Sequence, residues 1–396
     1  MPTGPPGAAR PATATPPPPS PPTEFSEDKN IRWKTPIPGL GSGSPIVWEN
    51  KIFLQTAIAG DAGPKGPHKF VVLCIDRETG KTLWQQVATE ATPHEGTHPD
   101  GNFAPFSPVT NGKQLVALFG SRGLYCYDLD GKLLWQKDLG RMQIKRAFGE
   151  GASPALHNNT LIINWDHEGE DFIAAFDVES GKELWRQKRD EMTSWSTPLI
   201  VEHNGKPQAI VPATGKIRSY DLADGKILWE VGGLTPNVIP CPVSADGIVY
   251  LMSGFRGNAL LAVRLGATGD LSKSDAVLWR HDKNTPYVPS PLLYNGRLYF
   301  FGGNRATLSC LDAKTGNAHY SAQSVDAMRG VYASPVAADG RVYLVDREGT
   351  VVVIKDADKF EVLATNKLND RFDASPALAG NTLILRGQKN LYCIGE

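Results

Sequence analysis

Residues 173–185 read IAAFDVESGKELW, and versions of this phrase recur along the chain. In each version, an alternating apolar run ends in an aspartate, a short turn ends in glycine and often lysine, and an apolar pair ends in tryptophan. Self-similarity at a regular period is typical of proteins built from repeated structural units. Three further copies keep the full phrase and three keep it in weakened form: residues 71–84, 124–135 and 217–229, then 261–279, 308–320 and 351–363.

A second landmark, Ser-Pro or a close relative, precedes each copy of the phrase. Between this landmark and the aspartate phrase lies a turn dipeptide followed by an apolar run, as at Asp246-Gly247 and Asn295-Gly296. Such dipeptides favour tight β-hairpins because both positions tolerate positive φ. The eight landmarks are Ser44-Pro45, Ser107-Pro108, Ser153-Pro154, Thr197-Pro198, Cys241-Pro242, Ser290-Pro291, Ser334-Pro335 and Ser375-Pro376.

Each repeat therefore contains four expected strands: the Ser-Pro strand, the strand after the hairpin, the aspartate strand and the tryptophan strand. Four antiparallel strands in a period of roughly 40–50 residues are typical of a propeller blade. The sequence thus predicts an all-β fold, an eight-bladed β-propeller of four-stranded antiparallel blades. A large tryptophan on the last strand is well placed to pack against the neighbouring blade.

The two ends of the chain supply complementary parts of one blade. The eighth repeat ends with Leu391–Ile394 and has no tryptophan strand, whereas Ile31–Thr35 contains Trp33 and belongs to no other repeat. We expect the N-terminal strand to join the last blade and close the ring, which removes the open sheet edges. The propeller then occupies residues 30–396. The first 22 residues contain ten prolines, so residues 1–29 are predicted to be a Pro-rich disordered tail.

Composition excludes several classes of function. The 396 residues include 41 basic and 42 acidic side chains, for a formal net charge of −1. Nonspecific nucleic-acid binding needs a basic excess, so no nucleic-acid partner is expected. No apolar stretch is long enough for a transmembrane segment, and the start of the chain lacks the apolar region of a secretory signal peptide. We expect a monomer.

The cysteines and the repeated aspartates have structural interpretations. Four of the five cysteines share one repeat position that is otherwise small or apolar, so they are expected in the core and too far apart to form disulfides: Cys74, Cys126, Cys310 and Cys393. The fifth, Cys241, replaces a landmark serine. The aspartates sit where a side-chain oxygen can support the following turn: Asp76, Asp128, Asp177, Asp221, Asp312 and Asp356.

The Asp…Gly-Lys-x-Leu-Trp phrase, together with the opening stretch Asn30–Gly39, resembles the PQQ-like (pyrroloquinoline-quinone-like) repeat family over residues 30–396. Its members include quinoprotein alcohol dehydrogenases and the BamB scaffold of outer-membrane protein assembly. The resemblance implies an extracytoplasmic location, periplasmic or secreted. The repeat builds the blade and carries no chemistry of its own, so it predicts the fold far better than the function.

Three functions are consistent with this resemblance. The leading expectation is a non-catalytic propeller that binds a protein partner or small ligand at a loop face, in the bacterial cell envelope. One alternative is a quinoprotein-like oxidoreductase, a relative of the dehydrogenases that use PQQ and calcium to oxidise alcohols or sugars. The other is a BamB-like outer-membrane protein assembly factor. The first cysteine is Cys74, so no lipidation cysteine is visible near the start.

The resemblance also implies where a cofactor would bind. The quinone-dependent members use a vicinal Cys-Cys disulfide, a stacking tryptophan, an arginine, Glu and Asn ligands to calcium, and an aspartate base. This chain has no Cys-Cys pair, so we expect no cofactor and assign no catalytic residue. Partial counterparts occur on the segments that enter the Ser-Pro strands, at one mouth of the expected channel: Glu150, Trp195, Asn237, Arg329, Arg371 and Asp373.

Two loops contain clustered polar residues. In the long connection of residues 85–106, His94, His98 and Asp100 are the residue types that bind a divalent metal, although Gly96 and Pro99 argue against the helix that would align the two histidines. The alternative is a solvated loop that could fold over a channel mouth. The acidic stretch 165–171 could hold calcium through carboxylates, and its default interpretation is an exposed turn.

Overall fold

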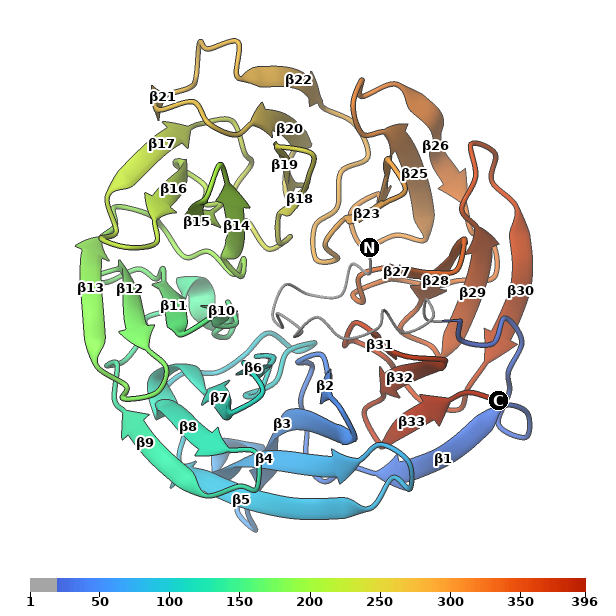
Figure 1. Ribbon diagram of the computed structural model, residues 1–396. Helices are drawn as coiled ribbons and strands as arrows, with labels where there is room; N and C mark the ends of the chain where they lie inside the picture. Colours follow the sequence, from blue (N-terminus) through green and yellow to red (C-terminus); the bar gives the residue numbers. More distant parts are fainter. Residues whose placement is uncertain (1–19) are drawn as a thin grey trace.

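The computed structural model describes residues 20–396 and consists of eight β-sheets arranged around a central axis (Figure 1). Seven sheets have four antiparallel strands, and the sheet of blade 4 has a fifth, parallel strand at its outer edge. The prediction of an eight-bladed β-propeller is confirmed. Among residues 20–396, no helix is long and apolar enough to cross a membrane.

From the channel outward, the first four blades contain these strands: blade 1, β2 (Ile46–Trp48), β3 (Lys51–Ala59), β4 (His68–Asp76) and β5 (Thr82–Ala91); blade 2, β6 (Val109–Thr110), β7 (Gln114–Leu118), β8 (Leu124–Asp128) and β9 (Leu133–Lys137); blade 3, β10 (Ala155–His157), β11 (Thr160–Trp165), β12 (Phe172–Asp177) and β13 (Glu183–Lys188); blade 4, β14 (Leu199–His203), β15 (Lys206–Val211), β16 (Ile217–Asp221), β17 (Ile227–Val231) and the added β21 (Gly269–Asp270).

The other four blades contain these strands: blade 5, β18 (Val243–Ala245), β19 (Ile248–Ser253), β20 (Ala259–Arg264) and β22 (Val277–His281); blade 6, β23 (Leu292–Tyr294), β24 (Arg297–Phe301), β25 (Thr307–Asp312) and β26 (Ala318–Ser324); blade 7, β27 (Val336–Ala338), β28 (Arg341–Val345), β29 (Thr350–Lys355) and β30 (Val362–Lys367); blade 8, β31 (Ala377–Ala379), β32 (Thr382–Arg386), β33 (Asn390–Ile394) and β1 (Ile31–Pro36). Three short 3-10 turns lie in loops: η1 (Gly63–Lys65), η2 (Gly120–Arg122) and η3 (Lys145–Ala147).

The core lies between blades. The two middle strands of each blade are buried along most of their length, as in β29, because both sheet faces pack against neighbouring blades. The outermost strands alternate between exposed and half-buried residues, as in β1, because one of their faces meets solvent. Cys74, Cys126, Cys310 and Cys393 are fully buried free thiols, as expected.

Strand β1 pairs with β33 and closes the ring. The antiparallel register places Trp33 opposite Cys393 and Thr35 opposite Leu391. Figure 1 shows the blue N-terminal strand β1 lying beside the red C-terminal strand β33. The predicted closure of the last blade by the N-terminal strand is confirmed.

The tryptophans of the outer strands join each blade to the next. The Trp33 Nε1 atom donates to the carbonyl oxygen of Arg77 at 2.8 Å, and Gly80 in the same turn has a φ of +70° and lies against the indole ring. A side chain on Gly80 would collide with that ring, since its Cβ would lie 2.6 Å from the indole. The same indole-to-carbonyl bond occurs at four other junctions, through Trp84, Trp135, Trp185 and Trp279.

The Ser-Pro landmarks form a chain of hydrogen bonds around the channel. The backbone N–H of Ser107 donates to the Ser153 hydroxyl at 2.9 Å, and the Ser153 N–H donates to the Thr197 hydroxyl at 3.0 Å. Among the described residues, six of the eight junctions have such a bond. The chain is interrupted after Thr197, where Cys241 has no hydroxyl, and between Ser375 and Ser44, where the ring closes.

The prediction that residues 1–29 form a disordered tail is wrong for residues 20–29, and residues 1–19 lie outside the described part of the chain. Phe25 is 3% exposed and belongs to the core cluster of blades 7 and 8. Its N–H donates to Asn366 Oδ1 at 2.8 Å, and Tyr343 donates its hydroxyl to the Pro21 carbonyl at 2.8 Å. The aromatic anchor and these hydrogen bonds order a segment whose composition alone predicts disorder.

Candidate functional site

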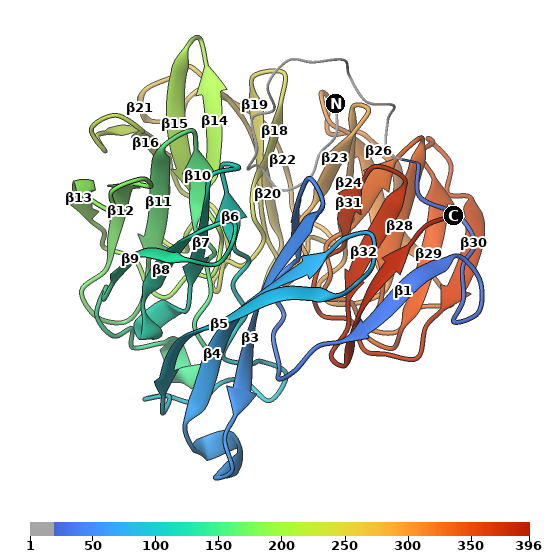
Figure 2. The ribbon, with the colours of Figure 1, turned by 60° about the horizontal axis from the view of Figure 1, so that its bottom comes forward.

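The candidate site lies at the end of the ring where the connections between blades gather. Because the four strands of a blade alternate in direction, the connections between blades and the loops between the two middle strands lie at the same end; we call this end the connection face. The hairpin β3–β4 extends this face at blade 1, where each strand has nine residues. In Figure 2 this hairpin points downward, beyond the other blades.

Residues 92–108, between β5 and β6, form a long connection that we call the strap. Strand β5 continues to Ala91, so the connection starts later than the sequence predicts. The strap is anchored on the connection between blades 2 and 3, where His94 Nε2 lies 2.7 Å from the Met142 carbonyl and the His98 N–H donates to the Phe148 carbonyl at 3.0 Å. In Figure 1 the cyan strap runs toward the middle of the ring.

The tip of the strap reaches blades 7 and 8. Asp100 Oδ1 accepts hydrogen bonds from Arg347 Nη2 at 2.9 Å and from Arg371 Nη2 at 3.0 Å. The Tyr332 hydroxyl donates to Asp100 Oδ2 at 3.2 Å. These contacts join residues more than 230 positions apart, so the strap folds over the channel mouth.

Asp373 fixes one of these arginines. Its Oδ1 atom accepts a hydrogen bond from Arg347 Nε at 2.6 Å, and the Arg347 guanidinium lies 3.7 Å from the centre of the Tyr332 ring. Burial raises the pKa of Asp373 above its ordinary value, and Arg347 opposes this shift. Of the six channel-mouth candidates, the structure brings only Arg371 and Asp373 into one cluster, with Arg347 and Tyr332 as members that sequence reasoning missed.

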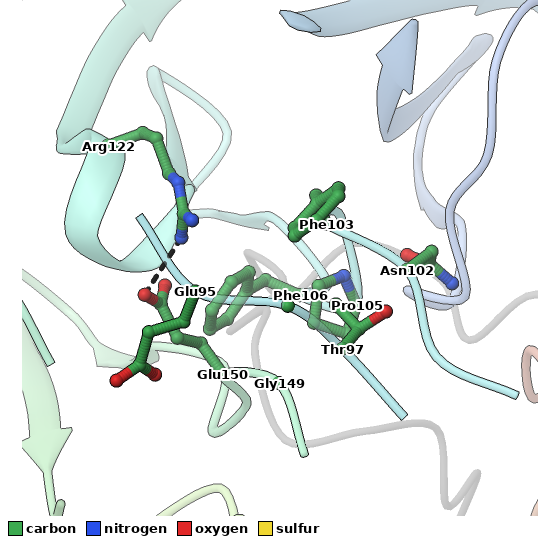
Figure 3. A pocket seen from close by; sticks show the side chains of 10 residues that line it. Glu95, Thr97, Asn102, Phe103, Pro105, Phe106, Arg122, Gly149 and Glu150 are labelled. Atoms are coloured by element: carbon green, nitrogen blue, oxygen red, sulfur yellow. Dashed lines mark ion pairs between the residues drawn. The ribbon is translucent and has the colours of Figure 1, made fainter. Parts of the chain in front are cut away.

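Glu150 and Trp195 have partners of their own at blades 2 to 4. Glu150 Oε1 lies 2.8 Å from Arg122 Nη1 and accepts the Ser121 hydroxyl at 2.6 Å, and both members of the ion pair are nearly buried. Figure 3 shows Arg122 pointing at Glu150 beside the strap residues Phe103 and Phe106. The Trp195 indole donates to the Gly149 carbonyl at 2.8 Å. These side chains hold connections together.

The side chains of Asn237 and Arg329 form no ion pair within the described chain, although the next residue of each bonds to one of these groups: the Val238 carbonyl accepts the Trp195 N–H, and the Gly330 carbonyl accepts the Arg347 N–H. Asn237 is 2% exposed with a φ of +56°, and its Oδ1 atom has no hydrogen-bond partner within the described chain. Arg329 Nη1 donates to the carbonyls of Asp326 and Met328, so it supports its own turn.

The cavity beside Glu150 is too small for the tricyclic quinone that the family resemblance brings into question. The cavity beside Glu150 encloses about 10 Å³, which is room for roughly one water molecule. Glu150 is already paired with Arg122, and the Trp195 indole N–H is bonded to the Gly149 carbonyl.

The metal candidates do not converge. His94 is turned to the Met142 carbonyl, and Asp100 is held by two arginines; only His98 lies near Asp100, with 3.9 Å between Nδ1 and Oδ2. No group of three or more His, Cys, Asp or Glu side chains in residues 20–396 is placed to hold a metal ion. The side-chain placement therefore does not support the predicted metal site.

The acidic stretch 165–171 is more buried than an exposed turn. Asp166 is 2% exposed and forms a two-pronged ion pair with the fully buried Arg189, at 2.5 and 3.0 Å. The Arg189 Nη1 atom also donates to the Tyr220 hydroxyl of blade 4 at 2.6 Å. The default interpretation of this stretch as an exposed acidic turn holds for its tip, residues 168–170, and is wrong for Asp166, which is buried and joins blades 3 and 4.

An aromatic group is partly exposed on the connection face at blades 5 and 6. The rings of Phe255 and Tyr287 stack with centres 5.0 Å apart and an angle of 27°, and the Arg256 guanidinium lies 5.3 Å from the Phe255 ring. Phe255 follows β19 and Tyr287 precedes β23, so both lie in loops of this face. Aromatic residues and arginine are the types that dominate binding energy at protein interfaces.

The repeat pattern and the closed ring define a propeller of the PQQ-like repeat class. A family model described as "Outer membrane protein assembly factor BamB" matches residues 68–239, 213–332 and 266–393. The chain therefore belongs to this family of BamB-like, PQQ-like repeat propellers.

Characterised relatives have the same description. The chain is 24% identical over 390 residues to the outer membrane protein assembly factor BamB of Yersinia pestis, which covers 83% of this chain and 93% of the relative. It is 24% identical over 383 residues to the BamB of Burkholderia pseudomallei, covering 93% and 89%. The match to BamB of Escherichia coli strain K12 is 27% identical over 195 residues, covering 46% and 45%.

Solved structures with this fold have more than one kind of function. BamB from Moraxella catarrhalis superimposes with a TM-score of 0.61 at 12% identity, over 91% of this chain and 98% of that one. A europium-containing methanol dehydrogenase gives 0.60 at 12%, over 91% and 85%. The quinohemoprotein alcohol dehydrogenase of Comamonas testosteroni gives 0.63 at 11%, over 92% and 76%. At these identities the likeness establishes the fold alone.

Proposed function

We propose that the protein is a non-catalytic β-propeller scaffold of the bacterial cell envelope that binds a protein partner, as a BamB-like factor in outer-membrane protein assembly. The observation that carries this proposal is the near full-length alignment to BamB of Yersinia pestis, over 93% of that relative. The same alignment supports an extracytoplasmic location.

The contacts at the channel mouth support binding over catalysis. Glu150, Arg371 and Asp373 are engaged in ion pairs within the chain, and the strap covers the mouth that a substrate would have to enter. A rigid ring with such a closed mouth offers loop surfaces for docking. The stacked pair of Phe255 and Tyr287 is the docking region that we propose, because large half-buried rings give contact area at a low cost in side-chain entropy.

The test is co-purification from membranes of the source bacterium. A tagged chain, cross-linked in living cells, is expected to recover the proteins that assemble outer-membrane β-barrels. The double variant Phe255→Ala/Tyr287→Ala should lose at least tenfold of that recovery at an unchanged melting temperature. The matched control is Leu184→Ala, which removes a half-exposed apolar side chain from the outer strand β13 and should recover as much as the wild type.

Two results would contradict this function. One is recovery of the chain in the cytoplasmic fraction with no envelope protein bound. The other is oxidation of alcohols or sugars in a dye-reduction assay after addition of PQQ and calcium, with activity lost in Glu150→Ala and Asn237→Ala. The second result would favour the quinoprotein-like alternative, for which the unpartnered Asn237 Oδ1 atom is the specific motivating feature.

A further inference from the structure

Two guanidinium groups from different blades converge on one oxygen atom of the strap. Arg347, in the loop after β28, and Arg371, in the connection before β31, both donate to Asp100 Oδ1, at 2.9 and 3.0 Å. Tyr332 donates to the other oxygen at 3.2 Å. Charge-assisted hydrogen bonds of this kind are about twice as strong as neutral ones, and arginine is the side chain best suited to bind a carboxylate.

Most of the cluster is held in place without the strap. Arg347 has a side chain that is 14% exposed, is fixed by Asp373 at 2.6 Å and lies over the Tyr332 ring. Arg371 is 41% exposed and lies at the open side of the cluster, with its Nε 3.5 Å from Asp373 Oδ2. Without Asp100, two arginines would face a single carboxylate, so the cluster would keep one positive charge.

Asp100, in contrast, arrives on a loop without regular secondary structure. It is 36% exposed and lies within a tight turn of residues 98–101, in which the Gly101 N–H donates to the His98 carbonyl at 2.7 Å. Among the described residues, all hydrogen bonds between the strap and blades 7 and 8 go through the Asp100 carboxylate. The tip can therefore leave the cluster by breaking three contacts of one side chain.

We propose that Arg347, Arg371 and Tyr332 form a binding site for an acidic side chain of a partner protein, and that Asp100 is a built-in occupant which the partner displaces. The proposal rests on the protein-binding function proposed above and names the chemistry of one contact. A peptide carboxylate is the favoured ligand because the site in its present state holds an aspartate in a tight turn of the chain. Asp100 is tethered to the site and competes at an effective concentration on the order of millimolar. A partner's carboxylate can therefore bind only by displacing Asp100.

The test compares the wild type with Asp100→Asn, which removes the charge and keeps the shape. The probe is a fluorescein-labelled peptide of alternating aspartate and glycine, and its binding is measured by fluorescence anisotropy at low salt. Asp100→Asn is expected to bind the probe at least tenfold more tightly than the wild type. Adding Arg347→Gln or Arg371→Gln to that variant should abolish the gain.

A matched control removes a charge elsewhere on the same face. Asp61→Asn changes an exposed aspartate in the β3–β4 loop, outside the ion pairs of the described chain, and should bind the probe as weakly as the wild type. Equal gains in peptide affinity for Asp61→Asn and Asp100→Asn would mean that the net charge of the protein alone sets the affinity. No gain in affinity for Asp100→Asn would mean that Asp100 does not block the site. A gain that survives Arg347→Gln and Arg371→Gln would place the peptide elsewhere. Each of these results overturns the proposal.

A second measurement follows the strap without any ligand. In Asp100→Asn, hydrogen exchange at the amides of His98 and Gly101 should be at least threefold faster, while the melting temperature stays unchanged. Unchanged exchange would overturn the proposal, because the position of the strap tip would then not depend on Asp100. Peptide binding by the purified chain is independent of co-purification from membranes, so failure of the assembly function and failure of this site can be told apart.

Discussion

At the residue scale, the repeated aspartates act through the turns that follow them. Asp177 Oδ1 accepts both the N–H and the hydroxyl of Ser180, at 2.7 and 2.6 Å. Thr79 bonds to Asp76 and Thr315 to Asp312 in the same way. The prediction that the repeated aspartates support turns is confirmed at five of the six sites, since Asp128 and Asp221 also accept N–H groups of their turns. It is wrong for Asp356, which accepts the Tyr299 hydroxyl and the Asn295 side chain of blade 6. The hydroxyl hydrogen bond is the largest cause that holds the pKa of Asp76, Asp177 and Asp312 below the ordinary value of 3.8.

The triple variant Thr79→Ala/Ser180→Ala/Thr315→Ala should make stability less dependent on pH. A carboxyl whose pKa is lowered on folding stabilises the native state at pH values above the unfolded pKa, and this contribution is lost as the pH falls through the folded pKa. The variant should therefore melt below the wild type at pH 7, and the gap should narrow below pH 3.8. Melting curves across this range test the prediction. A gap that stays constant with pH would contradict it, and Thr79→Ser/Thr315→Ser should behave like the wild type.

Cys241 occupies the one landmark without a hydroxyl. In the variant Cys241→Ser, the new hydroxyl can accept the Thr197 N–H as its counterparts do at six other junctions. The expected gain is about 0.5–1.5 kcal/mol of unfolding free energy, the usual net value of one hydrogen bond. Denaturant unfolding measures it. The reverse change, Ser290→Ala, removes the hydroxyl that accepts the Cys241 N–H and should cost a similar free energy. A Cys241→Ser variant no more stable than the wild type would show that the Thr197 N–H lies too far from the new hydroxyl for a hydrogen bond.

At the scale of an element, the segment 20–29 completes blades 7 and 8. Thr23 accepts the Asn366 side chain at its carbonyl and Phe25 fills the core between β28 and β33. Ser26 forms a parallel bridge with Lys367, so the segment also covers part of the outer edge of β30. Covered edges do not recruit strands of other molecules.

Phe25→Ala should lower the unfolding free energy by about 3–5 kcal/mol, the usual cost of truncating a buried phenylalanine. Urea unfolding monitored by circular dichroism would measure the loss. Glu24→Ala is the control, because Glu24 forms only an exposed ion pair with Lys29, and such pairs contribute little. Equal stability of Phe25→Ala and the wild type would mean that this segment does not contribute to the core in solution.

At the scale of the whole molecule, closure by β1 couples the eight blades. Trp33 is only half-buried, so its removal should cost less than that of a core tryptophan. Trp33→Ala is expected to cost about 2 kcal/mol, roughly half the value for full burial. The comparison is Trp84→Ala, which breaks the same indole-to-carbonyl contact between blades 1 and 2.

Deletion through Thr35 removes the closing strand and should abolish the single cooperative transition. Calorimetry would then show broad or multiple transitions, since blade 8 would lose the strand that ties it to the N-terminal part of the chain. Trp84→Ala should keep one transition. A single sharp transition in the deletion variant would mean that the ring does not need its closing strand.

The repeat was readable from the sequence because it is local. The aspartate, the Gly-Lys turn and the tryptophan occupy adjacent strands, so one phrase of 13 residues reports the hairpin geometry of each blade. The complementary parts at Trp33 and Leu391–Ile394 revealed the closure because seven other copies define what a complete blade contains. The candidate site residues do not recur from blade to blade, so no other copy shows what each of them should contact. Glu150 and Asp373 were singled out from a family pattern, and the structure engages each of them with an arginine that carries no sequence signal.

The number of blades, the four strands of each blade and the strand that closes the ring follow from the amino-acid order, since they depend on turn chemistry and on side-chain alternation within a few residues. The folded chain was needed to show that Phe25 leaves a Pro-rich segment to enter the core, and that Asp100 meets Arg347 and Arg371 across the channel mouth. Contacts between residues 247 and 271 positions apart are made once. They have no period, and they exist only because ring closure brings blades 7 and 8 next to blade 1.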